Sequence, residues 1–429
     1  MAVIKAFKGM RYCTEKAGEI SSLCCPPYDI ISERERLAFI NENEYNIIRL
    51  EVPKEGENPY ACAADILKMW LDKGILKIED KPAIYIYEEE FSAGSERKSI
   101  KGIIARVQLE EFSKGIILPH EFTLSKAKED RLNLMKATNC NFSQIYALYM
   151  DEKHTTLATI DELSKSPADL EFTDETGVTH RLWIENDEKT IAKLVSDFAD
   201  RKLYIADGHH RYETALNYRN YCRENSISKV GDAQDFQMIY LVDMEHPGLV
   251  VFPTHRLVRD LPDFDKDAVL EKCSEYFYID EKEGVENMEK ELAALYDEDK
   301  KAFGFYCGKN EWFLLTLKNL DIMAEMLPDV SKASQSLDVS ILHTLVLEKI
   351  FGIDKENMAN QKNLTYTKYF SEAISGVDSG EFQCSFVLNP TRVTEIRDIA
   401  AAGEKMPQKS TYFYPKMITG MVMNNLGVD

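Results

Sequence analysis

The chain has 429 residues, 44% of them hydrophobic and 29% charged, which is enough for two or three globular domains. No basic start precedes an apolar targeting segment, and no apolar run approaches membrane-spanning length. The formal net charge of −21 opposes bulk attraction to nucleic acid, because that attraction needs Lys and Arg to neutralise phosphates. We therefore expect a cytoplasmic globular protein without a nucleic-acid or membrane partner, in which an anion site would be a local cluster of cations.

The nine cysteines are scattered singly, apart from the adjacent pair Cys24 and Cys25. Their number is odd and no C-x-x-C spacing occurs, which favours reduced intracellular thiols over a disulfide framework or a zinc site. Neighbouring cysteines rarely bridge, and Pro26-Pro27 extends the chain after them, so we interpret this pair as structural.

Strand-like and helix-like runs alternate along the chain, which predicts a mixed α/β fold. Helices are expected at 61–73 and 210–223, where apolar residues recur on one stripe. After Pro262 the rhythm changes to acidic helices and a separate strand pair, which places a domain boundary between 1–261 and 262–429. The predicted strands are 46–50, 83–88, 100–109, 145–150, 202–206, 236–242, 249–252, 302–307, 312–317 and 381–388.

The most informative segment is 203–211, an apolar strand that ends in Asp207-Gly208 and opens into a helix carrying His209, His210 and Arg211. Cations in the first turn oppose the helix dipole unless an anion sits there, so the arrangement predicts a phosphate site. Gly208 permits positive φ or close approach of a ligand, Arg211 suits phosphate oxygens, and the histidines can donate or shuttle protons. The alternative is a plain connection in which Asp207 caps the helix.

A second cluster, His120 and Glu121, follows Pro119. On a strand these consecutive side chains would point to opposite faces, so only one would meet a shared ligand unless the backbone turns. Pro119 favours such a turn, and both residues are candidates for acid–base chemistry. The alternative is a polar loop that leads into a solvated helix.

A third cluster, His255-Arg256, closes a strand and repeats the histidine–arginine pairing. Ligands of open α/β sheets bind beyond the carboxyl ends of strands, so two such pairs could converge on one crevice. A structural pair with its hydrogen bonds satisfied is the alternative. We predict that the Asp207 turn, His255-Arg256 and the loop at 409–416 share one site.

That loop holds Lys409, Ser410, Thr411 and Lys416 among three aromatic residues, close to the C-terminus. The lysines could supply point charges to a polyphosphate or carboxylate, and the hydroxyl groups could bind it or a metal. A tail strand docked by its aromatic residues is the alternative.

The N-terminal segment 26–32 is the weakest candidate, because Asp29 or Ser32 could simply cap a helix beginning near Glu33. The chain contains no G-x-x-x-x-G-K-[ST], G-x-G-x-x-G, H-E-x-x-H or G-x-S-x-G motif. The usual nucleotide-loop, zincin and hydrolase readings are therefore excluded, and a phosphate site would be of another kind.

Five segments read Pro-Pro-Tyr-Asp-Ile-Ile at 26–31, Pro-His-Glu-Phe-Thr at 119–123, Ala-Asp-Gly-His-His-Arg-Tyr-Glu-Thr-Ala at 206–215, Pro-Thr-His-Arg at 253–256 and Met-Pro-Gln-Lys-Ser-Thr-Tyr-Phe-Tyr-Pro-Lys at 406–416. Together they resemble the bacterial and archaeal family called domain of unknown function 1015, and the resemblance spans nearly the whole chain.

The Asp-Gly-His-His-Arg segment is in turn similar to the phosphate-binding turn of the ParB and sulfiredoxin superfamily, which includes nucleotide-dependent free-serine kinases and chromosome-partition proteins. This resemblance implies a ParB/sulfiredoxin-like α/β core with an inserted segment, in 1–261, and a C-terminal α+β domain, in 262–429, whose final loop returns to the site. Sulfiredoxin's catalytic cysteine is replaced here, where His209 follows Gly208, so sulfinic acid reduction is not expected.

These observations favour a phosphoryl-transfer enzyme, for example a kinase of free serine or a similar small hydroxyl metabolite, using ATP or ADP with Mg²⁺. Gly208, His209, His210 and Arg211 would hold phosphates, with Lys409 and Lys416 adding charge. Glu121 or Asp207 would act as the base. The alternatives are a phosphatase of phosphoserine-like compounds and a nucleotide-binding regulator without turnover. The acceptor, the nucleotide, a metal ligand set and the oligomeric state do not follow from the sequence.

Overall fold

The computed structural model describes residues 1–94, 96–121, 123, 125–284 and 287–428, without the side chains of 125–127, 283 and 359. The chain divides into two units. Unit 1 comprises Met1–Pro119, Thr123–Leu249 and Pro415–Asp429, and unit 2 comprises His120–Phe122 and Val250–Tyr414. Within the described ranges, no helix combines the length and the apolar character needed to span a bilayer.

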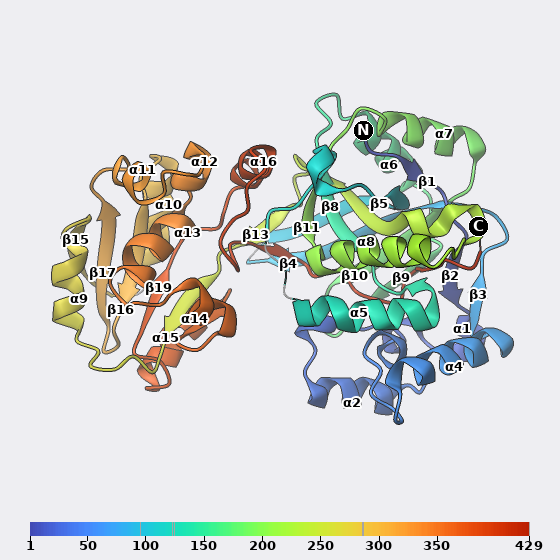
Figure 1. Ribbon diagram of the computed structural model, residues 1–429, viewed down its shortest axis with the longest axis horizontal. Coiled ribbons are helices and arrows are strands. Elements are labelled where there is room, and N and C mark those ends of the chain that lie inside the picture. The colour runs from blue at the N-terminus through green and yellow to red at the C-terminus, as the bar shows by residue number, and fades with distance from the viewer. Residues whose placement is uncertain (95, 122, 124, 285–286, 429) are drawn as a thin grey trace. The chain divides into compact units, whose positions relative to one another are not determined.

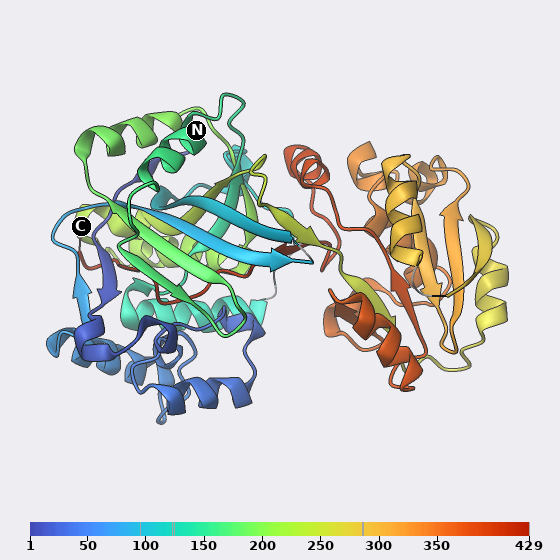
Figure 2. The same ribbon diagram turned by 180° about the vertical axis from the view of Figure 1, so that it is seen from behind.

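The main sheet of unit 1 contains nine strands in the described part of the chain. Its order is β6-β11-β8-β12-β5-β4-β10-β9, and β1 pairs with β5. Neighbours are antiparallel, except that β6 pairs with β11 and β8 with β12 in parallel. Figure 2 shows the long strands β4 and β5, in light blue and cyan, beside the green hairpin of β9 and β10. The bounds are β1 Ile4–Lys5, β4 Ile84–Ala93, β5 Glu96–Gln108, β6 Ile117–Leu118, β8 Ile145–Tyr149, β9 Leu170–Thr173, β10 Thr179–Glu185, β11 Leu203–Asp207 and β12 Phe236–Asp243.

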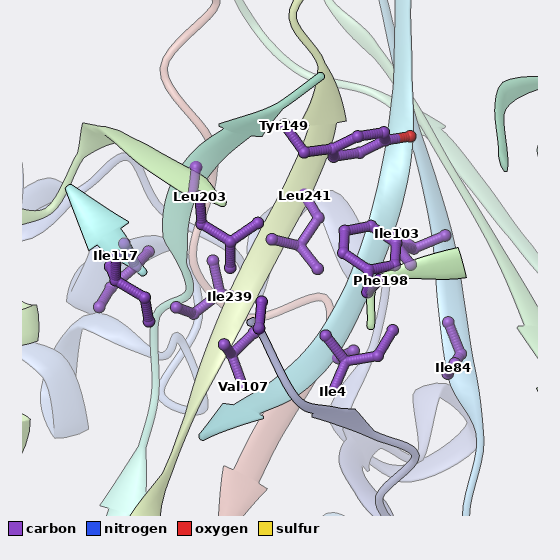
Figure 3. Packing of buried hydrophobic residues seen from close by; sticks show 14 of the residues in the cluster. Ile4, Ile84, Ile103, Val107, Ile117, Tyr149, Phe198, Leu203, Ile239 and Leu241 are labelled. Carbon is purple, nitrogen blue, oxygen red and sulfur yellow. The ribbon is translucent and has the colours of Figure 1, made fainter. Parts of the chain in front are cut away.

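One face of this sheet forms the aliphatic core of unit 1 (Figure 3). Helices α6 (Thr155–Leu163), α7 (Glu188–Asp197) and α8 (His209–Glu224) add apolar side chains to it. Each large aliphatic side chain removed from water contributes about 1.5–3 kcal/mol, so this layer supplies much of the driving force for folding. Its labelled members are Ile4, Ile84, Ile103, Val107, Ile117, Tyr149, Phe198, Leu203, Ile239 and Leu241.

The opposite face carries a row of buried tyrosines from β4, β12 and β8. The ring of Tyr240 lies 5.4 Å from that of Tyr87 and 5.3 Å from that of Tyr146, measured between centroids. Gly102 makes this contact feasible, because a Cβ there would lie 2.8 Å from the Tyr240 ring and 2.3 Å from the carbonyl oxygen of Leu241. The two faces therefore differ in chemistry, and the side to which a strand residue points decides its surroundings.

A smaller antiparallel sheet completes unit 1, in the order β3 (Leu76–Ile78), β2 (Gly9–Tyr12), β21 (Met423–Asn425) and β7 (Cys140–Asn141). Of the two caps that the sequence offered for the helix near Glu33, Ser32 is the one at the N-cap of α2 (Glu33–Glu42), where it forms a capping box with Glu35. Helix α5 packs against α8 (Figure 1). The remaining helices of the unit are α1 Thr14–Ala17, α2 Glu33–Glu42, α3 Ile48–Glu51, α4 Pro59–Asp72 and α5 Ser125–Thr138, with short turns η1 Ile20–Ser22, η2 Tyr28–Ile30, η3 Phe112–Lys114 and η4 Val230–Asp235.

Unit 2 is built on an antiparallel six-stranded sheet in the order β15-β17-β16-β19-β14-β18, with a separate pair β13-β20. Its core clusters around Trp312, Leu314 and Val387. The strands are β13 Val250–Phe252, β14 His255–Val258, β15 Phe277–Glu283, β16 Ala302–Tyr306, β17 Glu311–Leu317, β18 Leu364–Thr367, β19 Cys384–Val387 and β20 Tyr412–Tyr414. The helices are α9 Lys266–Cys273, α10 Met288–Asp297, α11 Ile322–Met326, α12 Lys332–Gln335, α13 Asp338–Ile341, the π-helical η5 Leu342–Glu348, α14 Lys355–Asn360, α15 Phe370–Asp378 and α16 Val393–Ala401.

The mixed α/β class is confirmed, while one predicted strand is wrong. Residues 48–50 of the segment 46–50 lie in helix α3 instead of a strand. The buried side chain of Asn46 donates to the carbonyls of Ser22 and Cys24 and accepts the N–H of Ile48, and this last hydrogen bond starts the helical turn. Unit 2 begins at Val250, earlier than the expected position 262, since β13 and β14 pair with later strands of that unit. All nine cysteines are free thiols.

Candidate functional site

A β-bulge places Asp207 at the end of β11. Along β8, Ile205 is opposite Ala147 and Asp207 is opposite Tyr146, so Ala206 is an extra residue. Strand side chains alternate, and one inserted residue moves those that follow to the other face. Asp207 thereby leaves the aliphatic core and joins the tyrosine face, at the start of α8.

Gly208 is the residue at which β11 turns into α8, and its φ is 92°. A Cβ there would lie 3.0 Å from the Arg211 Nε, so glycine serves both the backbone conformation and the packing of the arginine. Gly208, and not Asp207, occupies the N-cap position of α8. The first-turn N–H groups of a helix lie outside its own hydrogen-bond ladder, and they carry the positive end of the helix dipole.

Two cations meet at Asp207. Arg211 donates to Oδ2 at 2.8 Å, and Lys416 donates to Oδ1 at 2.6 Å. These side chains are mostly buried, with 23% of Asp207, 11% of Arg211 and 18% of Lys416 exposed. One carboxylate thus gathers two positive groups, and the three together carry a net charge of +1 at the start of a helix.

The same ion pairs define what Asp207 can do chemically. Burial alone would raise the pKa of this carboxyl, but Lys416 and Arg211, with a smaller effect of His209, hold its pKa well below the ordinary value. A carboxylate with so low a pKa is a weak base. Its geometry suits orientation of the two cations rather than acceptance of a proton.

The two terminal nitrogens of the Arg211 guanidinium are hydrogen-bonded to described residues, whereas its Nε is not. Nη1 donates to the Gln144 carbonyl, while the buried Nε has no hydrogen-bond partner. Arg211 also lines a cavity of about 40 Å³ with Arg131 and Gln237, whose buried Oε1 likewise has no partner. A space of this size and polarity suits one or two water molecules.

Arg131 was missed as a site residue because its segment reads as a solvated helix. It is only 7% exposed, donates to the carbonyl of Glu51 and lies 4.4 Å from the ring centroid of Tyr28. Burial raises the pKa of Tyr28 to about 12, so this phenol stays protonated. The Pro-Pro-Tyr segment that contains Tyr28 offered the one available signal, since it is a rigid turn that ends in an aromatic side chain.

His120 and Glu121 belong to unit 2, where both engage the loop at 406–411. The carbonyl of His120 accepts the N–H of Met406, and its Nε2 lies 3.1 Å from the Thr411 Oγ1. Glu121 accepts the Lys409 N–H at 3.3 Å. The backbone bends at Glu121, so both side chains meet one partner segment. Phe122 lies outside the described residues.

His255 and Arg256 lie in β14 and are almost wholly buried. His255 Nδ1 accepts the N–H of Leu388, and burial lowers the pKa of His255 to about 4, so the ring is neutral. Arg256 donates to the carbonyls of Thr254 and Lys409. Arg256 thus holds the 406–411 loop, as the structural alternative expects, whereas the buried Nε2 of His255 has no hydrogen-bond partner among the described residues.

That loop is tightly built. Lys409 adopts a left-handed conformation with φ of 56°, which is uncommon for a residue other than glycine. Ser410 donates to the carbonyl of Pro407, and its own carbonyl accepts from Thr391. Hydrogen bonds from both sides therefore fix this conformation.

The structure brings together two sets of predicted residues. Within unit 1, Asp207, Gly208, His209, His210 and Arg211 lie with Lys416. Within unit 2, His120, Glu121, His255, Arg256, Lys409, Ser410 and Thr411 surround the 406–411 loop. The single site that would combine both sets stays a prediction. Among the described residues, no group of three or more His, Cys, Asp or Glu is arranged to hold a metal ion.

Several solved structures show a remote likeness to the chain, and no curated protein matches it in sequence. A conserved hypothetical protein from Pyrococcus furiosus is 14% identical, covers 73% of this chain and 93% of its own, and has a TM-score of 0.35. A free serine kinase in complex with AMP is 12% identical, covers 73% of this chain and 88% of its own, and has a TM-score of 0.37. SbnI with C-terminal truncation from Staphylococcus aureus is 10% identical, covers 74% of this chain and 85% of its own, and has a TM-score of 0.34. At these scores the likeness does not extend to function.

The family model described as "Protein of unknown function (DUF1015)" matches residues 4–340, which is most of the chain and includes the Asp207 turn and β14. The protein therefore belongs to the DUF1015 family.

Proposed function

We propose that the protein is a phosphoryl-transfer enzyme that binds nucleotide phosphates at the start of α8. The observation that carries this proposal is the pairing of Arg211 and Lys416 with the single carboxylate of Asp207. The net charge of +1 adds to the positive end of a 16-residue helix, and both attract an anion. Phosphate oxygens are acceptors that suit an arginine fork and a lysine ammonium together.

The residues present fit such a group. The Arg211 Nε is a buried donor without a partner, and Gly208 removes the side chain that would keep a ligand from the first-turn N–H groups. Mg²⁺ is commonly held through substrate phosphates and water rather than by a protein cage, so ATP or ADP would bring it as a chelate. When bound, the metal would neutralise charge on the phosphates.

The chain's own residues would then act by position and charge. Arg211 and Lys416 would neutralise the phosphates, and His209 and His210 would donate to them. Asp207 would orient the two cations, since its low pKa makes it a poor base. We assign proton acceptance to Glu121, with His120 beside it in the chain, and further neutralisation to Lys409. Ser410 and Thr411 are proposed as additional donors, and His255 and Arg256 as supports of their loop.

For the acceptor we propose free serine or a similar small hydroxyl metabolite. The test is phosphate transfer followed by ³¹P NMR, with purified protein, Mg²⁺, ATP or ADP, and serine. An Arg211→Ala variant removes the fork, and Lys189→Ala at an exposed position of α7 is the matched control. Acceptor-dependent transfer that is lost in the first variant and kept in the second supports the kinase.

Other outcomes would select the alternatives. Release of phosphate from phosphoserine without nucleotide would mark a phosphatase. Nucleotide binding without turnover would mark a regulator. Failure of the protein to bind any nucleotide or phosphate would refute the site itself.

A further inference from the structure

Unit 1 contains a second cavity, of about 280 Å³, that is separate in its lining residues from the Asp207 cluster. Its volume is close to the lower end of the range for small-molecule sites. The N-terminal segment, α2, the turn between β9 and β10, and the C-terminal segment form its walls. The lining residues are Ser21, Cys24, Cys25, Pro26, Phe39, Glu42, Phe172, Thr173, Asp174, Glu175, Thr176 and Ile418.

The charge of this lining has one sign. Glu42, Asp174 and Glu175 line the cavity, and no Lys, Arg or His does. Glu42 and Glu175 form no ion pair with any described cation, so neither charge is compensated within the part of the chain that the structure describes. An anionic ligand would be repelled here, whereas a cation would meet uncompensated carboxylates.

Asp174 is held in place by a buried network. Its Oδ2 lies 3.1 Å from the Nε2 of His180, which is 1% exposed, and its Oδ1 accepts the N–H groups of Thr176 and Val178. The other ring nitrogen of His180 lies 2.8 Å from the Tyr87 hydroxyl. Burial raises the pKa of Asp174, but the hydrogen bonds outweigh it and leave the pKa below its ordinary value, so the carboxyl is ionised.

The rest of the lining is apolar or weakly polar. Phe39, Phe172 and Ile418 supply apolar surface. The thiols of Cys24 and Cys25 are 5% and 2% exposed, and neither sulfur makes a hydrogen bond to a described residue. Burial raises the pKa of both, so they remain neutral, unpaired S–H groups against the cavity. Aromatic faces beside carboxylates suit a cation that carries an apolar body.

We infer that this cavity binds a small organic cation, namely a primary amine on an aromatic or short aliphatic body. The carboxylates would receive the ammonium group, and Phe39 and Phe172 would pack against the body. The inference does not depend on nucleotide binding at Asp207, because the two sites share no lining residue and prefer opposite charges.

The test compares two probes of nearly equal shape, 2-phenylethylamine and 2-phenylethanol, by calorimetric titration of the full chain at low salt. The amine should bind about tenfold more tightly, because only it carries the charge that the carboxylates attract. A Glu42→Gln/Glu175→Gln double variant should weaken the amine about five- to tenfold and leave the alcohol unchanged. Both positions are exposed, so this variant does not depend on core packing.

Glu15→Gln/Glu152→Gln is the matched control, since it removes two exposed carboxylates that do not line the cavity. A Thr173→Trp variant, with an exposed strand position filled by a large ring, should abolish binding of both probes. Equal affinity of amine and alcohol, an equal loss in the control variant, or full binding after Thr173→Trp would overturn the inference.

Discussion

Replacement of Lys416 by methionine tests the central claim about the Asp207 cluster. Methionine keeps an apolar stem of similar length and removes the ammonium that lies 2.6 Å from Asp207. The net charge of the cluster then falls from +1 to zero. Two unit charges 4 Å apart interact by about 4 kcal/mol at an effective dielectric constant of about 20. Partial exposure of the cluster reduces this, and we expect ADP affinity to fall about 10- to 100-fold, which corresponds to about 1.4–2.8 kcal/mol.

A second change at Asp207 makes the reasoning refutable. The Asp207→Asn/Lys416→Met double variant regains a net charge of +1 from Arg211 alone, and the asparagine carbonyl can still accept the arginine N–H. It should therefore bind ADP more tightly than the single Lys416→Met variant. Calorimetric titration with ADP, beside thermal unfolding of each variant, measures both effects. Unchanged affinity after Lys416→Met, or no recovery in a folded double variant, would refute the electrostatic account.

Three further predictions concern stability. Gly208→Ala adds a Cβ at a residue whose φ is 92° and places it 3.0 Å from the Arg211 Nε. Urea unfolding should therefore show that the free energy of unfolding falls by about 1–2 kcal/mol. An unchanged unfolding midpoint would contradict the strained turn. Burial raises the pKa of Glu89 to about 7, so the folded state binds more protons than the unfolded state between about pH 4.3 and 7, and stability should fall as pH rises through that window. Glu89→Gln should flatten this decline in urea midpoints at pH 5, 6 and 8, and a parallel decline in the variant would assign it to other groups. Gly102→Ala would place a Cβ 2.3 Å from the Leu241 carbonyl, and thermal unfolding should report a loss of about 1–3 kcal/mol or more, unlike a tolerated surface change.

The fold class and many strands followed from the sequence because apolar periodicity is a local signal. The strand before Asp207 and helix α8 were both predicted from it. The segment 46–50 failed for a non-local reason, since the Asn46 side chain bonds to carbonyls more than twenty residues away in the chain. Apolar composition could not reveal those partners.

In the candidate site, too, features that depend on residue type were predicted, whereas features that depend on contacts between distant segments were not. Gly208, Arg211 and Lys416 were identified by residue type and by motif, and two of them pair with Asp207. The bulge at Ala206 was not predictable, because nothing in an apolar run marks which residue lacks a partner. Arg131 and the acidic cavity were missed for a related reason, since both depend on segments that meet only after folding.

The position of strand β21 near the end of the chain affects the order in which the two units can fold during synthesis. It lies between β2 and β7, its Asn424 is wholly buried, and the Asn424 side chain bonds to both Arg106 and Asn141. The small sheet of unit 1 cannot form completely until residues 250–414 have been translated, because β21 follows them in the chain. Unit 2 faces no such delay, apart from the short piece at 120–122 that is already made. A released chain that ends after Tyr414 keeps all of unit 2 but lacks β21, so it should hold a folded unit 2 beside a unit 1 that is more sensitive to protease.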